Sequence, residues 1–162
     1  MTDQAPGGPS DVRLLAALTA VAWAALVVAA FGILSLVLDL EVIPQSDAGP
    51  LLGPVMVLVA GAVLGLLIVR IVRTGQPAGL SFVAAAAAVF LTLLFSGGIL
   101  YSFVRAEPVW LIVFPLSEAI SPFIVVASLL AGAAALAARA IGAAERSGRG
   151  RPRWPWEGDE ER

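Results

Sequence analysis

Residues 108–139 read PVWLIVFPLSEAISPFIVVASLLAGAAALAAR, a long apolar run that contains a single acidic side chain, Glu118. As one helix this run would extend about 48 Å, whereas the hydrocarbon core of a bilayer is about 30 Å thick. Pro115 and Pro122 lie on either side of Glu118, and proline lacks the backbone N–H that a helix interior requires. The run therefore predicts a membrane protein whose last helix is kinked or broken near Pro115–Pro122.

Two arrangements of this run remain open. Ser121 and Pro122 form a favourable helix start, because serine is a good N-cap and proline suits the first helical position. Residues 109–121 would then form a separate interfacial or re-entrant piece. Alternatively, one helix begins at Pro108 and is tilted and kinked through the prolines. A charged carboxylate at mid-bilayer costs about 3 kcal/mol, so we expect Glu118 near the outer boundary or against other helices.

The composition of the chain indicates a membrane protein throughout. Of its 162 residues, 59% are hydrophobic and 14% are charged, whereas soluble domains are about 25% charged. The chain contains no Cys and no His, which excludes disulfides, thiolate metal sites and histidine-ligated haem. We therefore expect no cofactor, no metal site and no nucleic-acid partner.

Four apolar runs alternate with short polar segments. Residues 1–12 are predicted to be a disordered cytoplasmic N-terminus, and residues 140–162 a cytoplasmic tail that is first basic and then acidic. Between them, a transmembrane domain of residues 13–139 is expected to hold spans at about 14–38, 51–69, 80–104 and 109–138. The predicted fold class is all-α, an integral membrane four-helix bundle.

The distribution of arginine predicts the orientation of the bundle. Every basic residue is an arginine, and nine of the ten fall on the side of the N-terminus, with Arg105 alone on the other. Short basic segments stay in the cytoplasm. We therefore expect both termini inside and a multi-pass location in the cytoplasmic membrane.

Small residues indicate where helices approach one another. Gly53, Gly61 and Gly65 share one ridge of the second span, and small residues let backbones pack closely in lipid. This ridge predicts either packing within the bundle or homodimerisation. The other spans have similar faces: Ala22, Ala25, Ala29 and Gly32; Ser81, Ala85, Ala88, Thr92 and Ser96; and Ser117, Ser121, Ser128 and Gly132.

Glu118 is the main candidate functional residue, because acidic residues inside spans often mark ion or substrate pathways. Ser117, Ser121 and the carbonyl released by Pro122 are candidate hydrogen-bond partners, and Arg105 is the cation on the expected outer side. The alternatives are a carboxylate in a first helical turn, a buried pair, and proton or cation handling. No catalytic residues are assigned, because the chain has no Ser–His pair, no zinc-protease motif and no phosphate-binding loop.

The tail is a second candidate contact with the membrane. A basic cluster beside a membrane attracts anionic headgroups by about 1 kcal/mol per residue. We expect anionic lipid to bind the tail through Arg146, Arg149, Arg151, Arg153, Trp154 and Trp156. The alternative is a disordered tail that only sets the topology. Aromatic residues predicted to anchor at the membrane interfaces are Trp23, Tyr101, Trp110, Trp154 and Trp156.

Four short spans with one intramembrane glutamate resemble the architecture of small multidrug resistance transporters. Those proteins carry the glutamate in the first span, whereas Glu118 lies in the last, and the likeness includes no motif. In composition the chain resembles uncharacterised small four-span membrane proteins of actinobacteria. We expect a non-enzymatic structural or accessory subunit of a membrane complex, acting on a membrane-protein partner or as a homodimer. The alternative is a small transporter or channel subunit that uses Glu118.

Overall fold

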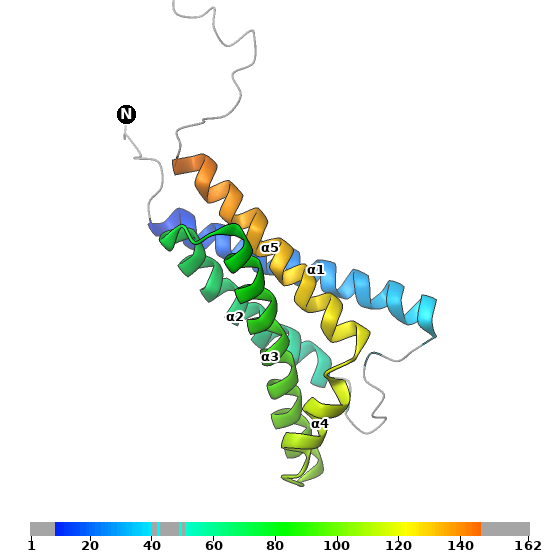
Figure 1. Ribbon diagram of the computed structural model, residues 1–162. Helices are drawn as coiled ribbons and strands as arrows, with labels where there is room; N and C mark the ends of the chain where they lie inside the picture. Colours follow the sequence, from blue (N-terminus) through cyan, green and yellow to red (C-terminus); the bar gives the residue numbers. More distant parts are fainter. Residues whose placement is uncertain (1–8, 40–41, 43–48, 50, 147–162) are drawn as a thin grey trace, which may run out of the picture.

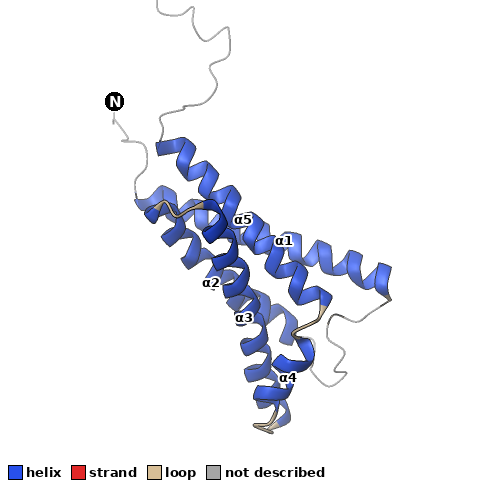
Figure 2. Ribbon diagram, in the orientation of Figure 1, coloured by secondary structure: helices blue, strands red, loops and turns tan. Residues whose placement is uncertain are grey.

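The described part of the chain is entirely helical. The computed structural model describes residues 9–39, 42, 49 and 51–146. Within these residues there are helices and no strands, as predicted for an all-α protein (Figure 2). The five helices are α1 (Pro9–Leu38), α2 (Leu52–Thr74), α3 (Ala78–Arg105), α4 (Trp110–Glu118) and α5 (Pro122–Arg146).

Four of these helices are long and apolar enough to cross a membrane. They are α1, α2, α3 and α5, so the predicted four-helix membrane bundle is confirmed in helix number and character. The helices extend past the expected spans, since α1 begins at Pro9 and α5 continues to Arg146. Their ends therefore carry charged side chains beyond the apolar core.

The last apolar run forms two helices, not one kinked helix. α4 ends at Glu118 and α5 begins at Pro122. The N–H of Ser121 donates to the carbonyl of Glu118 at 2.9 Å, and the N–H of Val125 donates to the carbonyl of Ser121 at 3.1 Å. Pro122 has no N–H to donate to the carbonyl of Glu118, and the break at 119–121 supplies the N–H of Ser121 instead.

The bundle is centred on α3, which packs against α2, α4 and α5, while α1 packs against α2 and α5. The start of α1, the α2–α3 link and the end of α5 lie at one end of the bundle, and α4 lies at the other (Figure 1). The far end of α1 diverges from the other helices. Only 11% of the most apolar part of α1 is buried, against 39% for α5.

A pair of glycines lets α4 lie directly on α3. A Cβ atom at Gly97 would overlap the ring of Phe114. At Gly98 a Cβ atom would lie 3.1 Å from Cδ of Pro115 and 3.4 Å from the carbonyl oxygen of Leu111, which Pro115 leaves without its helical donor. The absence of side chains at these two positions therefore allows the short helix to dock.

Candidate functional site

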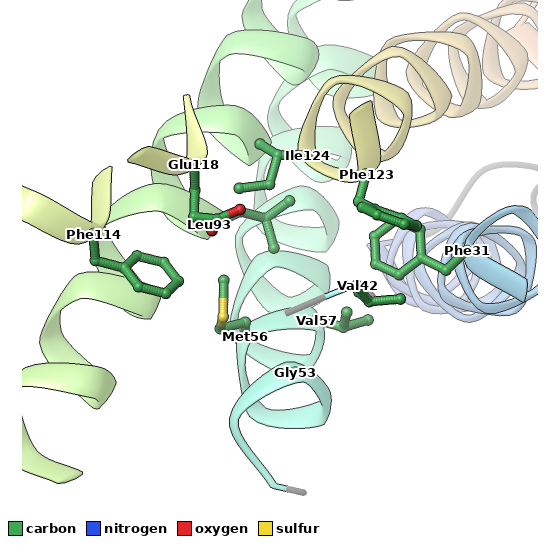
Figure 3. Close-up of a pocket in the computed structure, with 10 residues that line it drawn as sticks. All are labelled: Phe31, Val42, Gly53, Met56, Val57, Leu93, Phe114, Glu118, Phe123 and Ile124. Carbon is green, nitrogen blue, oxygen red and sulfur yellow. The ribbon is translucent and has the colours of Figure 1, made fainter. Parts of the chain in front are cut away.

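Glu118 lies inside the bundle at the end of α4, with 7% of its surface exposed. Figure 3 shows its carboxylate directed toward Leu93 of α3 and Ile124 of α5. It lines a cavity of about 40 Å³. The other residues around this cavity are apolar: Phe31, Val42, Gly53, Met56, Val57, Leu93, Phe114, Phe123 and Ile124.

The size of this cavity limits its chemistry. A cavity needs a volume of about 10–15 Å³ to hold one water molecule. The cavity beside Glu118, at about 40 Å³, therefore has room for only a few small species. Among the described residues that line it, Glu118 is the one acidic side chain. Water, a proton or a small cation fits here, whereas an organic substrate does not.

The predicted partners of Glu118 lie near it in different ways. Ser121 and Pro122 are part of the break itself, and the N–H of Ser121 binds the backbone carbonyl of Glu118. The hydroxyl of Ser117 donates to the carbonyl of Phe114 at 3.0 Å, within α4. The contacts described for these serines are therefore with backbone atoms and stabilise the turn.

Arg105 lies at the exposed end of α3 among aromatic rings. Its Cζ atom is 5.9 Å from the ring centroid of Tyr101 and 5.4 Å from that of Trp110, distances that permit cation–π attraction. The indole N–H of Trp110 donates to a carboxylate oxygen of Glu107 at 3.0 Å. The ring of Tyr101 lies 5.7 Å from that of Phe114, which connects this cluster to the cavity wall.

The prediction that Trp23 anchors at a membrane interface is wrong. Its side chain is fully buried, and its Nε1 donates to the carbonyl of Ala127 in α5 at 3.0 Å. A buried indole N–H needs such an acceptor. The ring also packs against α2, where a Cβ atom at Gly61 would lie 3.5 Å from Cζ3 of Trp23, an ordinary van der Waals distance.

The glycine ridge of α2 faces α1 within the same molecule. Gly61 lies against Trp23, and a Cβ atom at Gly65 would lie 3.9 Å from that of Ala20. Gly53 lines the cavity beside Glu118. Of the two alternatives for this ridge, packing inside the bundle is the contact that the structure contains.

The cavity is closed on the side of α1 by an aromatic pair. The rings of Phe31 and Phe123 are 5.4 Å apart and nearly perpendicular, and both line the cavity. This edge-to-face contact joins α1 to α5 close to the break before Pro122. Access to Glu118 from this side therefore depends on where α1 lies.

Comparison with known proteins assigns the chain to a family. The model of a family described as a family of unknown function, DUF6121, matches residues 11–162. The chain belongs to DUF6121. No curated protein and no solved structure matches it. The DUF6121 match includes all four membrane-spanning helices, the Glu118 cavity and the tail.

Two arginines of this DUF6121 protein bind backbone carbonyls at the other end of the bundle. Nε of Arg139 donates to the carbonyl of Gln76 at 2.6 Å, and Nη1 of Arg146 donates to that of Val72. The last carbonyls of a helix have no intrahelical donor, and a cation there also interacts favourably with the helix dipole. Sequence analysis assigned these arginines to topology or lipid and missed this contact.

Most of the predicted lipid-binding segment follows the last described residue, Arg146. Arg149, Arg151, Arg153, Trp154 and Trp156 lie outside the described residues. Of that segment, Arg146 alone falls within a described helix, at the last position of α5.

Proposed function

We propose that this protein is a non-enzymatic subunit of a membrane complex, and that it binds another transmembrane helix through one face of α1. The residues of this face are small, and we call it the small-residue face: Ala22, Ala25, Ala29 and Gly32. All four residues are exposed. This exposure is the observation that supports the proposal.

Four buried glycines of α3 and α5 support it by contrast. A Cβ atom at Gly97, Gly98, Gly132 or Gly142 would lie 3.1 Å or less from a side chain of a neighbouring helix. A Cβ atom at Gly32 would meet nothing within 4 Å. Glycine in a helix is about 1 kcal/mol less favourable than alanine, and close packing against another helix offsets that cost. The small-residue face therefore fits an additional helix better than it fits lipid.

We further propose that both termini lie in the cytoplasm and that the membrane is the cytoplasmic membrane. Nine of the ten arginines lie on the same side of the four spans as the N-terminus. Arg13, Arg73 and Arg139 belong to helix ends that lie at one end of the bundle (Figure 1). Arg105 is at the opposite end, at the last position of α3. Positive charge on cytoplasmic segments supports this orientation.

A second function is favoured by the position of Glu118. A buried carboxylate beside a break in the helix, at the edge of a cavity, is an arrangement used by proteins that move protons or cations. In this alternative the protein is a small transporter or channel subunit. Glu118→Gln separates the two functions, because it removes the charge and keeps the shape. Coupled flux in proteoliposomes would be lost, whereas binding of a helix to α1 would persist.

Cysteine crosslinking tests the proposed contact. The chain has no native cysteine, so Ala25→Cys introduces a single reactive site on the small-residue face. Val125→Cys is the matched control, because it is exposed on α5 and the Trp23–Ala127 hydrogen bond places α1 and α5 in register at this depth. In native membranes we expect a thiol crosslinker to give an adduct from position 25 and none from position 125.

The size of the adduct identifies the partner. An adduct of twice the chain mass means a homodimer, and a larger or smaller one means a different subunit. Ala25→Leu combined with Ala29→Cys should reduce the adduct severalfold, because leucine separates the backbones. Equal crosslinking from positions 25 and 125 would contradict the proposal.

A further inference from the structure

α1 and α2 enclose an open groove on the outside of the bundle. Its volume is about 850 Å³, within the range of about 300–1,000 Å³ that is usual for ligand pockets. Ala20 of α1 and Gly61 and Gly65 of α2 are among the residues that line it, and they are partly buried. These residues are small, and most of the side chains that line the groove are apolar.

One end of this groove is strongly basic. Arg13 of α1 and Arg73 of α2 both line it, and both side chains are exposed. Neither guanidinium has a hydrogen bond or an ion pair within the part of the chain that the structure describes. They differ in this from Arg139 and Arg146, which donate to backbone carbonyls. Two positive charges are therefore available to a ligand at this end.

The length of the groove matches one leaflet of a bilayer. From Arg13 to Ala24, both of which line it, α1 rises about 16 Å. The hydrocarbon core is about 30 Å thick, so this distance is about half of it. With the arginines at the membrane boundary, the small residues of the groove would extend to mid-bilayer. A phospholipid has the same order of groups, with a phosphate at the boundary and an acyl chain below it.

We propose that this groove binds an anionic phospholipid of the leaflet on the side of Arg13 and Arg73. The headgroup phosphate lies between the two guanidinium groups, which form charge-assisted hydrogen bonds with it. One acyl chain follows the groove past Gly65 and Gly61. Basic pockets between transmembrane helices are known to take anionic headgroups. The site is separate from the tail and from the small-residue face, which lies on another side of α1.

Spin-labelled lipids test this site in the full-length protein. The protein is reconstituted in phosphatidylcholine vesicles that contain a trace of labelled phosphatidic acid, phosphatidylglycerol or phosphatidylcholine with the same labelled chain. Electron paramagnetic resonance measures the immobilised fraction of each lipid, which gives relative association constants. We expect both anionic lipids to be preferred over phosphatidylcholine. Replacing both arginines, R13Q with R73Q, should reduce that preference by about fivefold for each arginine.

Charge-matched variants separate this site from general attraction to a basic surface. R70Q removes the same charge one turn away, at an exposed arginine that does not line the groove. It should leave the preference unchanged, and R13K with R73K should retain most of it. All of these variants keep the tail arginines, so the tail does not account for a difference. Equal losses in R70Q and R73Q would overturn the site.

The apolar part of the groove is tested by filling it. Ala17 lines the groove and is exposed, so Ala17→Phe occupies the space without touching the buried core. We expect it to lower the immobilised fraction of the anionic lipids at unchanged charge. An unchanged fraction would overturn the acyl-chain position. If a second copy of the chain occupies the groove instead, Ala17→Cys will crosslink to it in these vesicles, and that result would also overturn the proposal.

Discussion

Trp23 and Ala127 are joined by a hydrogen bond of 3.0 Å, from the indole Nε1 to a backbone carbonyl 104 residues away in the chain. Both residues are fully buried, in the middle of α1 and near the start of α5. This contact fixes how far α5 is displaced along α1. The ring also lies against Gly61 of α2, so one aromatic residue joins three helices.

Removing this hydrogen bond should weaken the bundle by a small, measurable amount. Trp23→Phe keeps most of the ring and should lower the free energy of unfolding by about 0.6–1 kcal/mol. Trp23→Ala also leaves a cavity and should cost about 3–5 kcal/mol. Denaturant titration in detergent measures both values. Equal stability of the native protein and Trp23→Phe would show that the contact contributes nothing.

A methyl group at Gly97 should destabilise the contact between α3 and α4. Gly97→Ala places a Cβ atom against the ring of Phe114, and such overpacking costs about 1–3 kcal/mol. Gly79→Ala is the control, since a Cβ atom at that position of α3 meets nothing within 4 Å. The control should be neutral or should stabilise by up to about 1 kcal/mol. Thermal unfolding compares the two, and a larger loss in the control would refute the docking argument.

The orientation of the bundle can be tested by labelling single cysteines in intact cells. A membrane-impermeant thiol reagent should label a cysteine at position 45, between α1 and α2, and should not label one at position 76, between α2 and α3. Permeabilised cells should show labelling at both positions, which controls for reactivity. The reverse pattern in intact cells would place both termini outside.

Loss of the arginine that binds the α2–α3 link should loosen that link. Arg139→Gln removes the donor to the carbonyl of Gln76, so the backbone of the link should exchange its amide hydrogens severalfold faster. Arg70→Gln is the control, because Arg70 is exposed and carries the same charge. Hydrogen exchange with mass spectrometry measures both. Equal exchange rates in the two variants would mean that Arg139 acts only through its charge.

The tail should bind anionic membranes in a salt-dependent way. A peptide of residues 139–156 carries five arginines and one acid, and four further acids follow it in the chain. We expect this peptide to bind vesicles that contain phosphatidylglycerol, and to bind more weakly when extended to Arg162. Raising the salt concentration should reduce binding, because exposed charges are screened. Binding that does not change with salt concentration would indicate that the tryptophans, and not the arginines, hold the peptide at the membrane.

The sequence predicts the helices of this protein well, because each apolar run is bounded by charge, proline or glycine. It also predicts the two possible forms of the last run, since Pro115 and Pro122 restrict the helix locally. It does not choose between them, because the choice depends on how α4 docks on Gly97 and Gly98 of α3. That contact joins segments whose relative register no local pattern encodes.

Trp23 and the C-terminal arginines illustrate the same limit at the level of side chains. The sequence around a tryptophan in a span is the same whether its side chain lies at the membrane interface or donates a hydrogen bond to a neighbouring helix. The burial of Trp23 depends on which parts of α2 and α5 lie opposite it in the bundle. Likewise, Arg139 binds Gln76 because the α2–α3 link brings a free carbonyl beside α5. The position of Glu118 was more accessible to prediction, since insertion energetics alone disfavour its exposure to lipid.

The divergence of α1 has a mechanical consequence for the cavity at Glu118. α1 is held at its middle by Trp23, and Phe31 lies two turns farther along, at the cavity wall. Phe31 is about 12 Å from that pivot, so a tilt of about 10° would displace its ring by about 2 Å. Such a displacement would separate Phe31 from Phe123 and widen the cavity. A tilt of α1 would therefore change the opening of the cavity that Glu118 lines.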